Sequence, residues 1–402
     1  MAAPTTTQYN AEYFTLEVLA QLANMRGIAR YAYWDYKKEN VPFGSAQNIT
    51  VPGIITASQN PFAAAQQIVP TSRSLQANAY AVARMYASDF QSALAGGSSS
   101  LINDHVTPAA TSVLEQLDSY FLQYYSYMTS RVVASRTDAL ATYKAIKMAL
   151  RRNNVPSNEP IAFIMDLEEE AAALSTTTYT TPAQTGDASV TMLRTGEMTG
   201  LLGVNPVPVN NAYVAISPGT ISLGAVPVIG VLAAGGAAGA TMITVSGLTA
   251  GLTIKQGDVL SIGALPFKFV ATGGPVTTAA STTFAIFPPL PTAVTAATAV
   301  RFDPLPAAIR FDPYYATAAF TPKAFGIIPC ELPIEGNELG AKQYSLTDSD
   351  TNLTIRATVT YNEGTAGYGA KQVKFDGLYA VGPVDPARGV LVCRKNVTDN
   401  IM

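Results

Sequence analysis

Apolar residues recur every three to four positions in two stretches of the N-terminal half, the spacing of one face of an α-helix. Residues 9–30 predict an amphipathic helix that docks as an arm on a partner surface. Thr107-Pro108, an N-cap followed by proline at the first helical position, begins the strongest helix pattern in the chain. This spine helix is expected to run for about 25 residues, or about 40 Å. Its apolar stripe comprises Val113, Leu117, Phe121, Tyr124, Met128 and Val132.

Strand-like segments lie before and after this helix along the chain. Val41–Val51 and Gln66–Ala83 predict the two strands of a long hairpin. A hairpin with so few core residues is unstable alone, so we expect it to reach over another protein surface. Near the C-terminus, the alternating segments Leu353–Tyr361 and Lys371–Val381 predict two further strands.

A second helix is predicted from Thr137-Asp138 to Arg151-Arg152, because cations suit the C-terminal end of a helix dipole. A short buried strand is expected at Ile161–Met165, which is an uninterrupted apolar run. This part of the chain is therefore expected to contain both helices and strands.

The acidic run Asp166-Leu167-Glu168-Glu169-Glu170 resembles a metal or acid–base site at first sight. However, Asp166 stands where an N-cap belongs, and glutamates in a first helical turn are favoured by the helix dipole. We therefore interpret all four carboxylates as a helix start.

Between Met198 and Val300 the chain holds only three charged side chains, Lys255, Asp258 and Lys268. The remaining 299 positions carry 50 of the 53 charged residues, so this composition step marks an inserted module. Glycines at near-regular spacing provide turns between short β-branched segments. The insert, residues 216–312, is therefore predicted to be a small β-barrel or sandwich.

One segment of the insert, Ala225–Val245, contains 21 residues without a charge and is long enough to span a bilayer. Pro227 and four glycines lower its helix propensity, and no lysine or arginine flanks it. We predict two strands around a Gly/Ala loop and no membrane partner.

Charged residues make up 13% of the chain, against roughly 25% in ordinary soluble domains. The net charge is only −3, while 48% of the residues are hydrophobic. Either a large core or a surface covered by copies of the same chain accounts for this composition. Cys330 and Cys393 are far apart and form no CxxC pair, so they are interpreted as reduced, buried thiols. The polar N-terminus predicts no secretory signal.

No catalytic or nucleotide-binding motif accompanies the remaining candidates. His105 is the only histidine and has no nucleophile or metal-binding motif beside it. Gly235-Gly236-Ala237-Ala238-Gly239 lacks the Lys-Ser/Thr ending of a phosphate loop, so it is interpreted as a flexible loop. We expect no cofactor and no bound metal.

A modest basic run, Arg26, Arg30, Lys37 and Lys38, lies among tyrosines and Trp34. Such a run suits either nucleic acid or protein, and at a net charge of −3 protein–protein docking is favoured. These four residues are candidate inter-subunit contacts.

In this order, the elements resemble the major capsid protein of tailed double-stranded DNA phages, the Hong Kong 97-type fold. Gly44–Pro52 resembles its extended loop, Val113–Tyr127 its spine helix, Arg194–Val204 its axial domain and Leu378–Gly382 its closing strand. Leu252–Gly263 is similar to part of the β-barrel insertion of the coat proteins of short-tailed Salmonella phages. The resemblance spans nearly the whole chain, and its specificity lies in the order of the elements.

The resemblance implies an α+β Hong Kong 97-type capsid fold with an inserted small all-β barrel. The expected segments are an N-terminal arm helix (1–40), an extended loop (41–83), a peripheral domain with the spine helix (84–150), a first axial part (151–215), the inserted barrel (216–312), and a second axial part with the closing strands (313–402).

The resemblance further implies a protein without enzymatic activity that forms the virion capsid. This capsid is an icosahedral shell of pentamers and hexamers that encloses DNA and assembles in the host cytoplasm. The expected partners are other copies, a scaffolding protein, a portal protein, a decoration protein and non-specifically contacted DNA. Members that crosslink covalently use a lysine of the extended loop, and residues 41–83 contain none. We therefore expect a non-crosslinked shell, with Arg73 and Arg84 as candidate contacts to a neighbour.

Two other functions remain open from the sequence. A β-rich tail or surface adhesin would use the low-charge insert as a receptor-binding head, although the helical spine argues against it. An enzyme would require Asp166, Glu168 and His105 to converge in one pocket.

Overall fold

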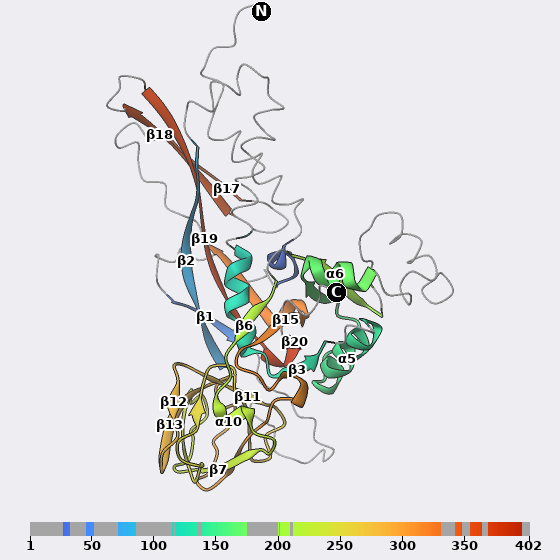
Figure 1. Ribbon diagram of the computed structural model, residues 1–402. Coiled ribbons are helices and arrows are strands. Elements are labelled where there is room, and N and C mark those ends of the chain that lie inside the picture. The colour runs from blue at the N-terminus through green and yellow to red at the C-terminus, as the bar shows by residue number, and fades with distance from the viewer. Residues whose placement is uncertain are drawn as a thin grey trace, which may run out of the picture. The chain divides into compact units, whose positions relative to one another are not determined.

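The computed structural model describes the following residues of the chain (Figure 1): 27–32, 46–51, 71–85, 115, 117–134, 139–174, 200, 202–209, 212–330, 342–347, 354–363 and 369–395. The chain divides into two compact units, each treated separately. The first combines Met1–Ile49, Ser74–Phe121 and Gly326–Gly382; the second combines Thr50–Arg73, Leu122–Phe325 and Pro383–Met402.

A six-stranded sheet dominates the first unit. Its order is β1 (Ala46–Val51), β2 (Thr71–Met85), β19 (Gly369–Pro383), β18 (Thr354–Glu363) and β17 (Lys342–Thr347), and β16 (Phe325–Cys330) also pairs with β19. The β2–β19 and β19–β18 pairs are antiparallel, and a register shift between Phe375 and Asp376 interrupts the first of them. The predicted hairpin and C-terminal strands are confirmed in the described residues. The hairpin is not isolated, because β2 is hydrogen-bonded to β19 of its own chain.

The N-terminal arm is described only at its end. The 3-10 helix η2 (Ile28–Tyr31) closes the segment predicted to be helical, and most of residues 9–30 lie outside the described residues. The Ile28 amide donates a 2.8 Å hydrogen bond to Oδ1 of Asp118 on the spine helix, and the Ile28 side chain is fully buried. The arm is therefore attached to the spine at this point.

The second unit contains a mixed sheet of order β3 (Ser130–Val133), β20 (Gly389–Arg394), β15 (Tyr314–Phe320), β4 (Ile161–Met165) and β5 (Val204–Pro208). β6 (Val214–Ile216) also pairs with β15. The β3–β20 and β4–β5 pairs are parallel, and β15 is antiparallel to β20, β4 and β6. All residues of β4 and β20 are buried, as expected for central strands.

Helix α5 (Ala139–Arg152) packs on this sheet through Tyr143, Ile146 and Leu150, which join Phe163 and Val392 in one apolar cluster. Helix α6 (Leu167–Leu174) begins directly after Asp166. The predicted C-terminal end of the second helix, the buried strand and the acidic helix start are confirmed. The remaining short helical turns are η5 (Ala307–Ile309), η6 (Pro322–Ala324) and η8 (Pro386–Arg388).

The spine helix ends earlier than its apolar stripe predicts. Residues 117–123 are helical, η4 (Tyr125–Tyr127) is a 3-10 turn, and β3 follows. Val132, which the pattern placed on the helix, instead pairs with Val392 in the sheet. The prediction was wrong here because Phe121 and Met128 are both buried, although only Phe121 lies on the helix. The predicted start at Thr107-Pro108 lies outside the described residues.

A closed antiparallel barrel forms within the predicted insert. Its strands are β7 (Val228–Leu232), β8 (Met242–Ser246), β10 (Val259–Ile262), β11 (Phe269–Thr272), β13 (Ser281–Phe287) and β14 (Ala299–Phe302), in the closed order β10-β11-β13-β8-β7-β14. Beside it lie the β9 (Thr253–Ile254) and β12 (Val276–Thr277) pair and the short helix α10 (Thr220–Leu223). The small all-β barrel is therefore confirmed, whereas the boundaries 216 and 312 stay predictions.

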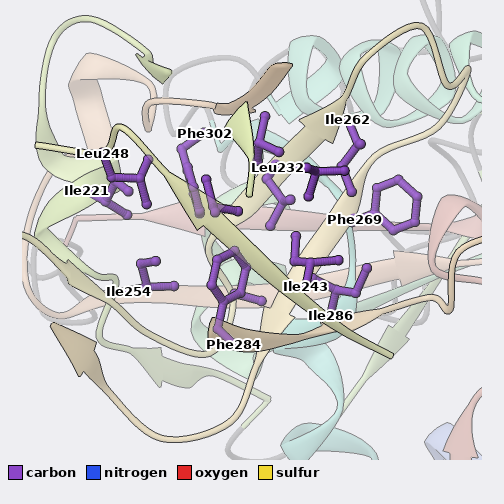
Figure 2. Close-up of a cluster of buried hydrophobic side chains, with 14 of the residues drawn as sticks. Ile221, Leu232, Ile243, Leu248, Ile254, Ile262, Phe269, Phe284, Ile286 and Phe302 are labelled. Atoms are coloured by element: carbon purple, nitrogen blue, oxygen red, sulfur yellow. The ribbon is translucent and has the colours of Figure 1, made fainter. Parts of the chain in front are cut away.

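Apolar side chains fill the interior of the barrel (Figure 2). Four strands contribute Ile243, Phe269, Phe284, Ile286 and Phe302 to one cluster, and each of these residues is at most 4% exposed. Buried and less buried residues alternate along β13 and β14, as the two faces of a strand require. The interior is a packed core rather than a ligand cavity.

The uncharged segment Ala225–Val245 forms β7, a loop and most of β8, as predicted. Among the described residues, no helix has the length and apolar character needed to cross a bilayer.

Gly230 provides a test of the packing between β7 and its neighbours. A Cβ added there would lie 2.7 Å from Cγ1 of Val245 and 2.8 Å from the Ser246 carbonyl oxygen. We expect Gly230→Ala to lower the free energy of unfolding by about 1–3 kcal/mol, because the added methyl group overpacks the core. Chemical denaturation followed by tryptophan fluorescence and circular dichroism would measure this change.

Gly274→Ala is the matched control, since a Cβ at Gly274 would meet nothing within 4 Å. It should change the free energy by no more than about 0.5 kcal/mol. Equal effects of the two substitutions would contradict the close packing described for Gly230.

Candidate functional site

The neck of the barrel, defined as residues 219–222 and 255–258 together with 126–131, contains several polar contacts that join the barrel to the sheet region. Its centre is Asp258, which is fully buried. The two carboxylate oxygens accept hydrogen bonds from the Gly219 amide at 3.1 and 3.2 Å, the Ser222 hydroxyl at 2.7 Å and the Lys255 amide at 2.8 Å. The carboxylate thus ties the chain entering the barrel to the turn between β9 and β10.

Burial raises the pKa of Asp258, and the hydrogen bonds from Lys255, Ser222 and Gly219 act in the opposite direction. Several donors are needed to hold a carboxylate in this position, because an unpaired buried charge is strongly disfavoured. Gly219 is required by the same arrangement, since a Cβ there would lie 2.3 Å from Oδ2 of Asp258 and 2.3 Å from the Thr253 carbonyl oxygen.

The β9–β10 turn is attached to the segment that follows the spine helix. A guanidinium nitrogen of Arg131 donates a short hydrogen bond to the Gly257 carbonyl oxygen. The Gln256 side chain donates a 2.9 Å hydrogen bond to the Ser126 hydroxyl. The Arg131 guanidinium also lies 5.9 Å from the ring centroid of Tyr314, the first residue of β15.

An aromatic contact lies beside these polar ones. The Tyr127 ring meets the Phe287 ring of β13 edge to face, with 5.2 Å between ring centroids and an interplanar angle of 83°. Burial raises the pKa of Tyr127. Since Phe287 ends a barrel strand, the barrel packs directly on the turn that terminates the spine helix.

The chain leaving the barrel is attached nearby. Nζ of Lys255 lies 3.4 Å from Oδ2 of Asp312, and Nζ of Lys395 lies 4.3 Å from the ring centroid of Phe311. All three charges of the low-charge stretch therefore have partners, because Lys268 forms an ion pair with Asp303 at 2.7 Å. The neck and its surroundings use these charges for internal contacts.

A second buried polar cluster lies in the sheet region. Glu169 of α6 forms a short ion pair with Arg394 at the end of β20 and accepts a 2.9 Å hydrogen bond from the Tyr213 hydroxyl. The Arg394 guanidinium lies 5.3 Å from the centroid of the Tyr213 ring. Burial raises the pKa of Glu169 and outweighs the opposing effect of Arg394.

This cluster changes the interpretation of the acidic run. Sequence reasoning explained Glu169 by the helix dipole alone, whereas the structure shows a side chain only 8% exposed with two specific partners. The only available signal was the position of Glu169 in the first turn of a helix that follows a buried strand. Its partners are distant in sequence, so no local pattern could identify them.

The candidate inter-subunit residues lie at separate places. Arg30 is exposed at the end of η2, and Arg73 and Arg84 belong to β2. Arg26, Lys37 and Lys38 lie outside the described residues. A role of these six residues in contacts between copies stays a prediction.

The other chemical candidates do not form a described catalytic site. His105 lies outside the described residues, as does the Glu168 side chain, so their convergence with Asp166 stays untested. In the described part of the chain, no group of three or more His, Cys, Asp or Glu residues is arranged to hold a metal. Cys393 is a free thiol, and burial raises its pKa to about 12. The Gly236 amide donates a 2.9 Å hydrogen bond to the Val294 carbonyl oxygen, so it is not available to donate to a phosphate.

Asp258→Asn tests the neck. The side-chain NH₂ group of asparagine would face N–H or O–H groups that now donate hydrogen bonds to Asp258, so some of these donors would lose their acceptor. We therefore expect a loss of about 2–3 kcal/mol in the free energy of unfolding. Equilibrium denaturation of the full chain would measure it. Asp303→Asn is the control, because its ion pairs lie on the surface and should cost less than about 1 kcal/mol. A neutral Asp258→Asn variant would contradict the role given to this carboxylate.

Glu169→Gln tests the second cluster. It leaves the Arg394 guanidinium buried without a negative partner, which typically costs about 3–5 kcal/mol. Glu170→Gln, one residue further along the helix at a less buried position, should cost clearly less. The double variant Glu169→Leu/Arg394→Met should regain most of the loss, because it removes both buried charges. Thermal and denaturant unfolding would rank the four proteins, and a stable Glu169→Gln variant would refute the expectation.

No protein-family model matches the chain, and no curated protein matches it. Among solved structures, one from Mycobacterium phage Che8 is similar over 92% of this chain and 91% of its own, with 14% identity and a TM-score of 0.43. The virus-like particle from Pyrococcus furiosus covers 95% of this chain and 98% of its own, with 7% identity and a TM-score of 0.40. The capsid structure of the cyanophage P-SCSP1u covers 91% and 87%, with 9% identity and a TM-score of 0.39. These three structures come from a Mycobacterium phage, a virus-like particle and a cyanophage capsid.

Proposed function

We propose that the chain is the major capsid protein of a tailed double-stranded DNA phage, with the Hong Kong 97-type fold. The observation that carries the proposal is the pairing of β2 with β19. The sequence resemblance assigned these two segments to the extended loop and to the closing strand, which lie far apart along the chain. Their pairing supports the proposal, because the two segments on which the resemblance rests form one sheet rather than unrelated parts of the chain.

The use of polar groups in the second unit supports a structural role. Asp258, Arg131 and Glu169 are each engaged with other parts of the same chain. Catalytic side chains, in contrast, typically lie in a cleft that a substrate can enter, and their pKa values are often shifted. Buried carboxylates that accept internal hydrogen bonds act as structural ties between segments.

The proposed assembly is an icosahedral shell of pentamers and hexamers that encloses packaged DNA. In it, the extended loop (41–83) contacts a neighbouring subunit, with Arg73 and Arg84 as contacts, while its strand β2 stays paired with β19 of its own chain. Arg26, Arg30, Lys37 and Lys38 contribute to docking of the arm. The proposed partners are a scaffolding protein during assembly in the host cytoplasm, a portal protein at one vertex and a decoration protein. Contact with DNA is non-specific. Residues 216–312 form the inserted domain of each subunit.

We further propose that the shell is not covalently crosslinked. Residues 41–83 contain no lysine, so the extended loop lacks the amine that forms an isopeptide bond in crosslinked relatives of this fold. Stability of the shell then depends on noncovalent contacts, repeated over many copies.

Electron microscopy of the purified protein tests the proposal, with the chain expressed alone and together with the neighbouring reading frames of its genome. We expect closed shells, sheets or tubes built from five-fold and six-fold clusters. On denaturing gels, mature particles should give a single band of monomeric chain. Monodisperse monomers or trimers under both conditions would refute the capsid function, and trimers that bind glycans would favour an adhesin. A ladder of covalent oligomers would refute only the absence of crosslinks.

A further inference from the structure

Helix α5 carries four cations and no acidic residue. The cations are Lys144, Lys147, Arg151 and Arg152, and these four residues are named the cationic face of α5. The chain as a whole has 25 lysines and arginines against 28 acidic residues, so a helix with cations alone departs from the general balance. The helix lies next to β3, the edge strand of the mixed sheet (Figure 1).

The four cations lie on the side of the helix that does not pack on the sheet. Residues three, four and seven positions apart share one face of an α-helix, so Lys144, Lys147 and Arg151 form one row. Lys144, Arg151 and Arg152 are exposed, and Lys147 is half-buried. The apolar residues of the opposite side are buried in the cluster with the sheet. The fold therefore holds the cations together at the surface.

The helix dipole explains only part of this face. Arg151 and Arg152 lie in the last turn, where cations are favoured, but Lys144 and Lys147 lie before it. Nζ of Lys147 donates a 2.5 Å hydrogen bond to the Leu202 carbonyl oxygen. A carbonyl group is neutral, so this contact leaves the charge of the ammonium group uncompensated.

In the described part of the chain, no acidic side chain forms an ion pair with the cationic face. Glu159, the next acidic residue along the chain, is paired with Arg388. On the barrel, in contrast, Lys268 and Arg301 share the carboxylate of Asp303. The cationic face of α5 thus has the positive local field that attracts a polyanion.

We propose that the cationic face of α5 is a contact surface for the phosphate backbone of double-stranded DNA, a proposal that rests on the capsid function proposed above for the choice of polyanion. Phosphate contacts require cations and carry no base-sequence information. A protein partner would instead be expected to bury an apolar core, and Met148 is the only large apolar side chain of the helix that is exposed.

The dimensions and the charge of the chain agree with this contact. Lys144 and Arg151 are seven residues apart, or about 10 Å along the helix axis. Duplex DNA carries one negative charge per roughly 1.7 Å of its axis, so a face of this length meets several phosphates at once. The net charge of −3 acts weakly here, because charges more than about 10 Å apart are largely screened at about 0.1 M salt.

Binding of the full chain to a labelled DNA duplex of mixed sequence tests the proposal, measured by fluorescence anisotropy over a range of salt concentrations. The triple variant Lys144→Gln/Arg151→Gln/Arg152→Gln removes three charges, and glutamine is a good helix former. Denaturation midpoints would confirm that the variant is folded. Lys144→Gln alone provides a second, milder variant at an exposed position before the last turn.

The matched control is Lys268→Gln/Arg301→Gln/Lys323→Gln. It removes the same number of charges from exposed positions of the second unit that lie outside α5. A general effect of net charge would therefore change the control and the triple variant equally.

For the wild type, we expect the logarithm of the association constant to fall with the logarithm of the salt concentration with a slope of about −3 to −4. This slope corresponds to about a 100-fold loss of affinity between about 50 and about 200 mM salt. The slope should become less steep by about three units in the triple variant and by about one unit in Lys144→Gln, and it should stay unchanged in the control.

The proposal is overturned if the wild-type chain does not bind the duplex, or if the folded triple variant keeps the wild-type slope. Polyglutamate with the same number of charges serves as a competitor. It should displace DNA only at a higher concentration, because its charges are about 3.3 Å or more apart when extended. Displacement at a lower concentration would assign the face to an acidic protein instead. A chain that binds DNA through α5 but forms no particles would refute the capsid function and leave this contact standing.

Discussion

The carboxylate of Asp258 joins segments of the chain that no regular secondary structure connects. It accepts hydrogen bonds from Gly219 and Ser222 before the first barrel strand and from Lys255 in a later turn. The same turn is hydrogen-bonded to Arg131 and Ser126, which belong to the region after the spine helix. A buried charge costs free energy unless it is fully hydrogen-bonded, so this position tolerates few alternatives. The connection between barrel and sheet depends on it.

The end of the spine helix shows where local patterns lose their predictive value. The stripe from Val113 to Val132 fits a continuous helix, yet Val132 lies in β3. Phe121 on the helix and Met128 beyond it are both buried, so hydrophobicity alone does not show where the helix ends. Contacts with distant parts of the chain determine where the helix ends. β3 pairs in parallel with β20, and Phe287 and Gln256 contact the residues of the turn. Tertiary contacts override helix propensity in such cases.

The prediction succeeded where the physical signal is local. Alternation and turn glycines indicated the barrel, and Asp166 followed by glutamates indicated the start of α6. The ion pair of Glu169 with Arg394 joins residues more than two hundred positions apart, and nothing near either residue in the sequence indicates it. Likewise, the three charges of the insert signalled its low polarity, but their partners became evident only in the fold. The exposure of Ile229 on β7 could not be predicted for the same reason. Alternation along a strand distinguishes two faces, but it does not show which face the rest of the protein covers.

The two ends of the insertion meet as partners in one sheet, because Ile216 of β6 pairs with Tyr314 of β15. Bringing two points about 100 residues apart together in a flexible chain costs about 4 kcal/mol of loop-closure entropy. A barrel that folds first, from its own hairpins, shortens that loop to the few residues of the neck. When the two halves of the sheet then pair, most of the loop-closure cost has already been offset by the folding of the barrel. Folding in this order would raise the folding rate of the sheet, because the barrel shortens the loop between the two halves of the sheet.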